Sequence, residues 1–210
     1  MQPEQTFWEF KKIHRRTPFE WKDEWGVWTR KILEHFCELG DKKHFEIGTN
    51  TRYWKEPDEK KKRDEKGSRK IKVYGKWVKV PGEYLVDFCW YKTEPKYCVK
   101  LAMEVEWQPW SNYKTLDPDW DFYKLLDIKT PLKIWVSSVN EEERQQQLEL
   151  LHEILKERTE MRIRGIERYL IVLFPHSETS LWVRGYEGDH KTGLRKEGSW
   201  REVGAFKIKK

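Results

Sequence analysis

Residues 82–90, GEYLVDFCW, and residues 101–107, LAMEVEW, decide the fold of this chain. They belong to two stretches, 84–92 and 98–107, that are rich in β-branched and aromatic residues. The Glu94-Pro95 step between these stretches is typical of a turn. We therefore predict two antiparallel strands joined by a short loop over 94–97. This loop pairs Lys92 with Val99, and the same register places Asp87 opposite Glu104.

Acidic side chains share one face of this predicted pair of strands. Successive residues of a strand point to opposite faces, so Glu104 and Glu106 project side by side, away from Met103 and Val105. Asp87 interrupts an otherwise apolar strand, which places it near the core. The sequence therefore predicts a partly buried cluster of carboxylates.

Opposed carboxylates on paired strands have Cβ atoms about 5 Å apart and repel each other. Burying them requires a compensating cation or a shared proton. A hard divalent ion such as Mg²⁺ or Mn²⁺ supplies that charge and keeps a bound water that can attack phosphorus. Two alternatives stay open: a Lys or Arg from a neighbouring strand pairs with the carboxylates, or the register differs by one residue and Glu104 faces solvent.

The rest of the chain alternates between helical and extended patterns. Apolar residues three and four apart, from Trp21 to Leu39, predict a helix that ends at Gly40, and Thr17-Pro18 separates it from an earlier helix over 4–15. Asp117-Pro118-Asp119 is typical of a helix start. The other predicted elements are strands over 71–80, 132–138, 169–174, 181–186 and 203–208, and helices over 119–128 and 141–158.

The segments GEYLVDFCW, LAMEVEW, DFYKLL and PLKIWV resemble the core of the PD-(D/E)XK nuclease superfamily, which includes restriction endonucleases. The resemblance covers about residues 21–136. It implies an α/β, restriction-endonuclease-like fold: a central mixed sheet flanked by helices, in the order αβββαβ, with an extra C-terminal helix and strands. We expect one domain over 1–210, with N-terminal helices in 1–40, the core in 41–140 and the added elements and a basic tail in 141–210.

The same resemblance implies the roles of individual residues. Asp87 is the motif aspartate, Glu104 the acidic residue that follows it, and Val105 the residue whose carbonyl also reaches the metal. Glu106 stands where the motif has lysine. Some members carry glutamate there, and others have the lysine on the next helix, where Lys124 matches. Lys124 also lies three residues from Asp121 and Asp127, which alone favours an exposed ion pair.

Glu34, in the first long helix, is a candidate for an acidic role that some members place there. It lies off the stripe of Trp residues, which favours a surface position.

Positive charge is concentrated in two segments, although the net charge is only +6. Residues 55–72 hold nine Lys or Arg against five acidic residues, and residues 190–210 hold seven against two. We expect these segments to contact the phosphates of DNA, or of RNA, unless they are only solvated charge. The candidate contacts are Lys60, Lys61, Lys62, Arg63, Lys66, Lys207, Lys209 and Lys210.

Composition narrows the class of protein. A content of 13 Trp excludes general disorder, and the longest apolar run, residues 169–174, is far shorter than the roughly 20 residues of a membrane span. No apolar signal-like stretch opens the chain, so we expect a cytoplasmic protein without a membrane partner. Cys37, Cys89 and Cys98 form no CxxC pair, which favours buried thiols over a zinc site.

The resemblance to the PD-(D/E)XK superfamily, together with the acidic cluster and the basic segments, implies an Mg²⁺- or Mn²⁺-dependent endonuclease or exonuclease that hydrolyses phosphodiester bonds in DNA. The main alternative is a non-catalytic nucleic-acid-binding or assembly protein that retains the fold. A third is an interaction module whose partner binds the Trp-rich N-terminal helices. Assembly as a homodimer also stays open.

Overall fold

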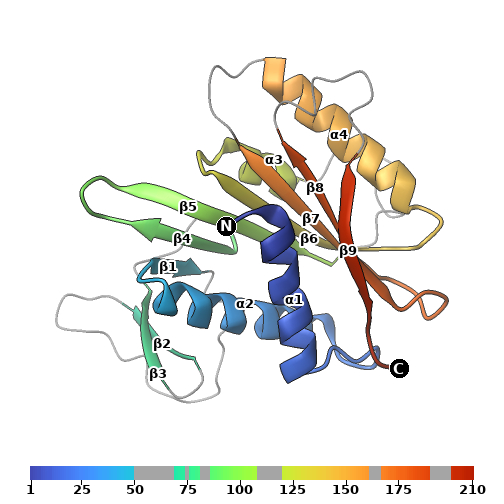
Figure 1. Cartoon of the computed structure of the whole chain (residues 1–210), viewed down its shortest axis with the longest axis horizontal. Helices are drawn as coiled ribbons and strands as arrows, with labels where there is room; N and C mark the ends of the chain where they lie inside the picture. Colours follow the sequence, from blue (N-terminus) through green and yellow to red (C-terminus); the bar gives the residue numbers. More distant parts are fainter. Residues whose placement is uncertain (50–68, 74–75, 81–85, 108–119, 161–166, 190–199) are drawn as a thin grey trace.

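The computed structural model describes residues 1–49, 69–73, 76–80, 86–107, 120–160, 167–189 and 200–210 (Figure 1). Four helices are described: α1 Pro3–Arg16, α2 Trp25–Lys42, α3 Trp120–Asp127 and α4 Arg144–Glu160. The strands are β1 Glu46–Thr49, β2 Arg69–Val73, β3 Lys76–Val80, β4 Phe88–Lys92, β5 Cys98–Glu106, β6 Leu132–Val139, β7 Arg168–Pro175, β8 Trp182–Asp189 and β9 Arg201–Lys207.

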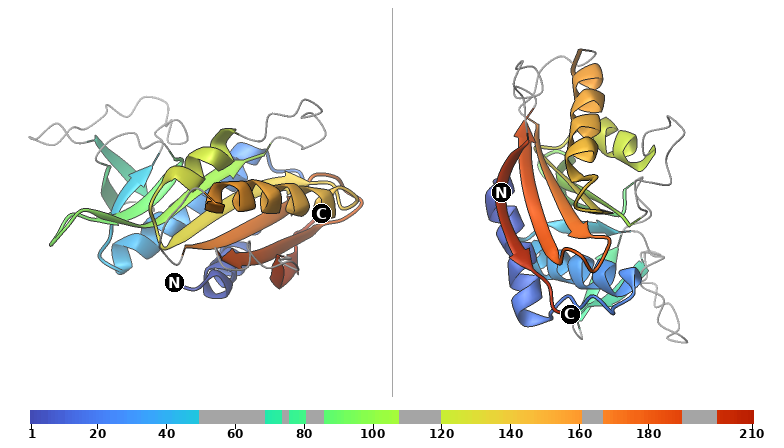
Figure 2. Two further views of the ribbon diagram at one scale, coloured as in Figure 1. Left: turned by 90° about the horizontal axis from the view of Figure 1, so that it is seen from above. Right: turned by 90° about the vertical axis from the view of Figure 1, so that its right-hand side faces the viewer.

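Seven of these strands form one mixed sheet in the order β1-β4-β5-β6-β7-β8-β9. Strands β5, β6 and β7 run parallel, and all other neighbours in the sheet are antiparallel. Helices α1 and α2 lie on one face of the sheet and α3 and α4 on the other (Figure 2). The predicted mixed sheet flanked by helices is confirmed, as are the elements from α3 to β9 within a few residues at each end.

Each face of the sheet carries its own apolar core, because neighbouring residues of a buried strand point in opposite directions. On β6, Ile134 and Val136 pack toward α1 and α2, whereas Trp135 packs toward α3 and α4. We call these two sides the α1–α2 face and the α3–α4 face. Residues at even positions near the end of β5, such as Ala102, belong to the α3–α4 face.

The predicted strand over 71–80 is wrong. These residues form a separate antiparallel hairpin, β2–β3, in which Ile71 pairs with Val78. The strand that pairs with β4 is instead the short β1, in which Ile47 lies opposite Trp90. A four-residue strand gives too little alternation for a sequence pattern to show it.

Gly40 does not end α2, contrary to the prediction. It is buried inside the helix, and a Cβ atom there would lie 2.5 Å from Trp90 Nε1. The helix ends instead in a Schellman motif: Phe45 N–H donates to the Gly40 carbonyl and His44 N–H to the Asp41 carbonyl. His44 adopts the left-handed φ of 56° that this motif requires. Glycine at position 40 therefore allows close approach of the Trp90 indole.

Helix α1 packs across β7, β8 and β9 as well as against α2 (Figure 1). The Phe7 ring lies where Cβ atoms of Gly185 and Gly204 would stand, at 2.3 and 2.9 Å, so both strands need glycine at these points. The ring also contacts Phe206 at a centroid distance of 5.9 Å. The first helix of the chain is thus seated on the last strands.

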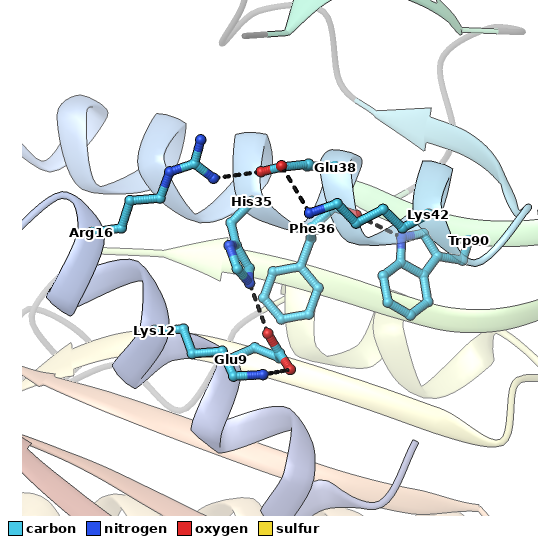
Figure 3. A network of polar contacts seen from close by, with 8 residues as sticks. All are labelled: Glu9, Lys12, Arg16, His35, Phe36, Glu38, Lys42 and Trp90. Carbon is cyan, nitrogen blue, oxygen red and sulfur yellow. Dashed lines mark hydrogen bonds and ion pairs between the residues drawn. The ribbon is translucent and has the colours of Figure 1, made fainter.

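Ion pairs bridge α1 and α2 at their surface (Figure 3). The Glu9 carboxylate accepts a hydrogen bond from Lys12 Nζ at 2.8 Å and lies 2.9 Å from His35 Nε2. Arg16 pairs with Glu38 at 2.6 Å. The Glu9–His35 and Arg16–Glu38 contacts join α1 to α2, whereas the Lys12–Glu9 pair lies within α1. No helix in the described part of the chain has the length and apolar character needed to cross a membrane.

Candidate functional site

The pairing of β4 with β5 follows the predicted register only at one end. Phe88 lies opposite Met103, and Trp90 opposite Leu101, as predicted. Beyond Trp90 the register shifts by one, so that Tyr91 pairs with Val99 and Lys92 with Cys98. The predicted Lys92–Val99 pair is therefore wrong. The extra residue, Lys100, forms a β-bulge, so that Val99 packs toward the α3–α4 face whereas Leu101 packs toward the α1–α2 face.

The register next to Phe88 brings Asp87 and Glu104 together, as predicted. Asp87 comes just before β4, and its backbone N–H donates to Glu104 Oε2 at 3.2 Å. In return, the backbone N–H of Val105 donates to Asp87 Oδ2 at 3.1 Å. Both acidic residues are buried, with 3% and 4% of their surface exposed. The alternative in which Glu104 faces solvent is thereby excluded.

Burial in this setting raises the pKa of the Glu104 carboxyl well above its usual range. Loss of hydration is the largest cause, and the charge of Asp87 and a hydrogen bond with its side chain act in the same direction. The charge of Asp121 adds to the effect. The raised pKa favours the protonated form of Glu104 when no cation is bound, as in the shared-proton arrangement that the sequence left open.

Helix α3 brings Lys124 to this carboxylate pair. Phe122 and Leu125 pack into the core of the α3–α4 face, and the helix contacts β5 and β6. Lys124 donates to Asp121, one turn earlier, and both side chains are about one-third exposed. The hydrogen bond with Asp121 raises the pKa of Lys124, and the negative charges of Glu104 and Asp87 contribute. The ion pair with Asp121 expected from spacing is therefore present, and the role of Lys124 at the acidic pair stays a prediction.

The other predicted site residues are Glu106, Val105 and Glu34. Glu106 is half-buried and lies opposite Ser137 of β6. Val105 contributes its backbone N–H to Asp87, and the metal contact of its carbonyl stays a prediction. Glu34 is half-buried rather than at the surface, and burial raises its pKa. It belongs to α2, on the face of the sheet opposite Glu104.

Two buried carboxyl groups within hydrogen-bonding reach of each other fit a hard divalent cation, because such an ion prefers oxygen ligands and replaces the shared proton. Among the described residues, no group of three or more His, Cys, Asp or Glu side chains gathers into a metal site. Of the residues that the structure describes, Asp87 and Glu104, with the backbone beside them, are those that could hold such an ion.

Sequence reasoning missed Thr49, the last residue of β1. Its side chain is fully buried, and its hydroxyl donates to the Asp87 carbonyl oxygen at 3.1 Å. It was missed because β1 itself was not predicted.

The structural role of Lys133 was also missed, because nothing in the sequence distinguishes it from other residues of the predicted strand. It is fully buried on β6, where its ammonium donates to the Leu126 carbonyl at 2.7 Å and pairs with Glu167 at 2.8 Å. Tyr169 Oη donates to the same carboxylate of Glu167 at 2.8 Å. Leu126 belongs to the last turn of α3, so Lys133 fixes the end of the helix that carries Lys124.

We expect Lys133→Met to lower the free energy of unfolding by about 3–5 kcal/mol, because the change leaves the Glu167 carboxylate without its buried cation. Urea unfolding followed by circular dichroism measures the change. The double variant Lys133→Met/Glu167→Gln should regain part of the loss, since no unpaired charge remains. A loss of less than about 1 kcal/mol, the usual value of a surface pair, would show that Lys133 does not anchor α3.

The basic segments are only partly described. Lys60, Lys61, Lys62, Arg63 and Lys66 lie outside the described residues. Lys207, Lys209 and Lys210 are exposed, as expected. The backbone around Lys209 is nevertheless anchored, because its N–H donates to the Phe19 carbonyl and its carbonyl accepts from Trp21 N–H. The C-terminal lysines therefore project from an ordered edge rather than from a loose tail.

The cysteines and the comparisons add little to this site. Cys37 and Cys89 are buried, as predicted, and Cys98 is half-buried.

No protein-family description, no curated protein and no solved structure matches this chain.

Proposed function

We propose that this chain is a metal-dependent nuclease that hydrolyses phosphodiester bonds in DNA, using Mg²⁺ or Mn²⁺ held by Asp87 and Glu104. The observation that carries the proposal is the pair of buried carboxyl groups, joined by reciprocal backbone hydrogen bonds, at the start of β4 and the end of β5. A stable sheet gains nothing from such a pair, since each buried carboxyl group must be desolvated. The pair is explained if the site exists to bind a cation.

We extend this proposal to the fold. The elements α2, β1, β4, β5, α3 and β6 follow each other as one helix, three strands, a helix and a strand, with the β2–β3 hairpin between β1 and β4. This order supports a restriction-endonuclease-like core in which β1 takes the place first given to residues 71–80. Under this proposal, Asp87 and Glu104 occupy the acidic positions of the motif.

Each residue of the site has a definite task in this proposal. A bound divalent ion lowers the pKa of a water ligand and offsets negative charge on the scissile phosphate. Asp87 and Glu104 hold the ion between β4 and β5, after Glu104 has released its proton. Lys124, when it leaves Asp121, places a positive charge beside the phosphate and favours the more negative transition state. Glu106 is the remaining candidate at the usual lysine position.

The basic segments are proposed to bind the nucleic acid backbone. Lys207, Lys209 and Lys210 are exposed cations at one edge of the structure, and such groups bind phosphates without reading sequence. The same role is proposed for Lys60, Lys61, Lys62, Arg63 and Lys66. RNA would satisfy these contacts as well as DNA.

A non-catalytic nucleic-acid-binding protein is the second candidate. The observation that favours it is the ion pair between Lys124 and Asp121, which occupies the only lysine that the resemblance offers to the reaction. In that case the acidic pair is a retained structural feature and holds a proton permanently.

Metal response separates the two candidates. We expect Mn²⁺ at 100 times its Kd to stabilise the protein by about 2.7 kcal/mol, and therefore to raise Tm by roughly 5–10 °C for a chain of this size. EDTA should reverse the shift, and Mn²⁺ should support cleavage of plasmid DNA. Differential scanning calorimetry with and without Mn²⁺ measures the effect, with Ca²⁺ as a second hard ion. An unchanged Tm together with intact plasmid would favour the non-catalytic protein.

A further inference from the structure

Asp87 is held at three different atoms by residues of two strands, β5 and β1. Its N–H donates to Glu104 and its carboxylate accepts from the Val105 N–H, so two of these contacts come from β5. The third comes from β1, where the Thr49 hydroxyl donates to the Asp87 carbonyl oxygen at 3.1 Å. Only this third contact is independent of the carboxyl groups that would bind a metal.

The position of Thr49 explains why a side chain makes this contact. The last pair of the β1–β4 ladder is Thr49–Phe88, and Asp87 is the residue that immediately precedes Phe88 in the chain. Asp87 itself lies in a bend outside β4. The hydroxyl therefore extends the ladder by one further hydrogen bond and fixes the plane of the peptide that joins Asp87 to Phe88.

Burying a hydroxyl at this point costs free energy of desolvation that packing alone does not require. Thr49 is fully buried beside the apolar strand β4, where valine has the same shape without a polar group to desolvate. Packing alone does not require the Thr49 hydroxyl. The hydroxyl instead donates a hydrogen bond to the backbone carbonyl of Asp87, the proposed metal ligand.

We propose that Thr49 is a positioning residue, whose hydroxyl fixes the Asp87–Phe88 peptide and so aims the Asp87 carboxylate at the cation. The metal part of this statement rests on the proposed function, whereas the orientation of Asp87 does not. Residues that orient a metal ligand typically contribute tenfold to a hundredfold to metal affinity or activity.

The test compares Thr49→Val, which removes only the hydroxyl, with Thr49→Ser, which keeps it. Thr49→Ala serves as a second deletion of the hydroxyl should valine prevent folding. Thr6→Val is the matched control, because Thr6 is equally buried and its hydroxyl donates to the Gln2 carbonyl at 2.9 Å in α1. Any general effect of losing one buried hydroxyl bond appears in that control.

Two measurements are made on each variant. Calorimetric titration with Mn²⁺ should show a Kd raised about 10-fold or more in Thr49→Val and Thr49→Ala, with Thr49→Ser and Thr6→Val close to the wild type. Hydrogen exchange should show the Val105 amide exchanging roughly tenfold faster in the two deletion variants, because its acceptor on Asp87 is less well oriented. For DNA cleavage we expect kcat to fall and KM to stay constant.

The outcomes distinguish this proposal from the proposed function. If Thr49→Val and Thr49→Ala keep wild-type Kd and wild-type exchange at Val105, or if Thr49→Ser loses as much as Thr49→Val, the positioning role is wrong while the nuclease proposal stands. If the wild type itself binds no Mn²⁺, the proposed function is wrong, and faster exchange at Val105 in the deletion variants alone would still support the orienting role of Thr49.

Discussion

Asp87→Asn and Glu104→Gln are each expected to abolish measurable DNA cleavage, a loss of about 10³-fold or more, while the protein stays folded. Each change removes a proposed metal ligand and keeps the shape of the side chain. Cleavage of supercoiled plasmid in Mn²⁺ measures the effect, with protein cleared of contaminating nuclease. Glu202→Gln, which changes an exposed carboxylate on β9, is the control and should cleave at the wild-type rate.

The same substitutions should change stability in the opposite direction. The folded-state pKa of Glu104 is raised, so its contribution to stability is complete below its unfolded pKa of about 4.5 and is lost as the pH rises toward the folded value. Glu104→Gln removes this loss. We therefore expect the metal-free variant to have a higher Tm than the wild type at pH 7 and above, and a Tm that depends less on pH. Wild-type cleavage in either variant would refute the role of these residues as metal ligands. An unchanged pH dependence of Tm in Glu104→Gln would contradict the raised pKa of Glu104.

Lys124→Met is expected to lower the cleavage rate by about 10²-fold, the loss that follows removal of one charge-stabilising donor. Helix α3 contacts β5, the strand that carries Glu104, and under the proposed function the Lys124 ammonium must reach that site from the helix. Single-turnover kinetics measure the loss. Lys156→Met is the matched control, since Lys156 also pairs with an acidic residue three positions earlier, Glu153, at 3.7 Å, and both side chains are exposed.

An unimpaired Lys124→Met variant would leave Glu106 as the only candidate at the lysine position. Glu106→Lys then becomes informative, since it restores the usual motif but also removes a carboxylate beside the site. We expect this variant to bind metal less well and to gain no activity while Lys124 is present.

The predictions from sequence succeeded where alternation in one strand determined the outcome. Glu104 interrupts the apolar pattern of β5, and Asp87 interrupts the apolar segment that leads into β4. The register of β4 against β5 next to Phe88 brings the two residues together. The register failed beyond Trp90 because the bulge at Lys100 adds a residue that leaves no mark in the composition.

The residues that support the site were not predictable in the same way. Thr49 acts through a contact between segments 38 residues apart in sequence, on a strand too short to show a pattern. Lys133 is a lysine in an otherwise apolar run, and only the position of the end of α3 explains its burial. Both depend on which elements become neighbours, and the local sequence does not specify this.

The seat of Phe7 on Gly185 and Gly204 also orders the events of folding. Helix α1 precedes β8 and β9 in the chain, and the surface that buries Phe7 is complete only when β9 has paired with β8. Closing contacts over such a sequence separation is slow, because most of the chain must be ordered first. The apolar side of α1 therefore stays exposed to chaperones, or to other nascent chains, until β8 and β9 have been made and have paired.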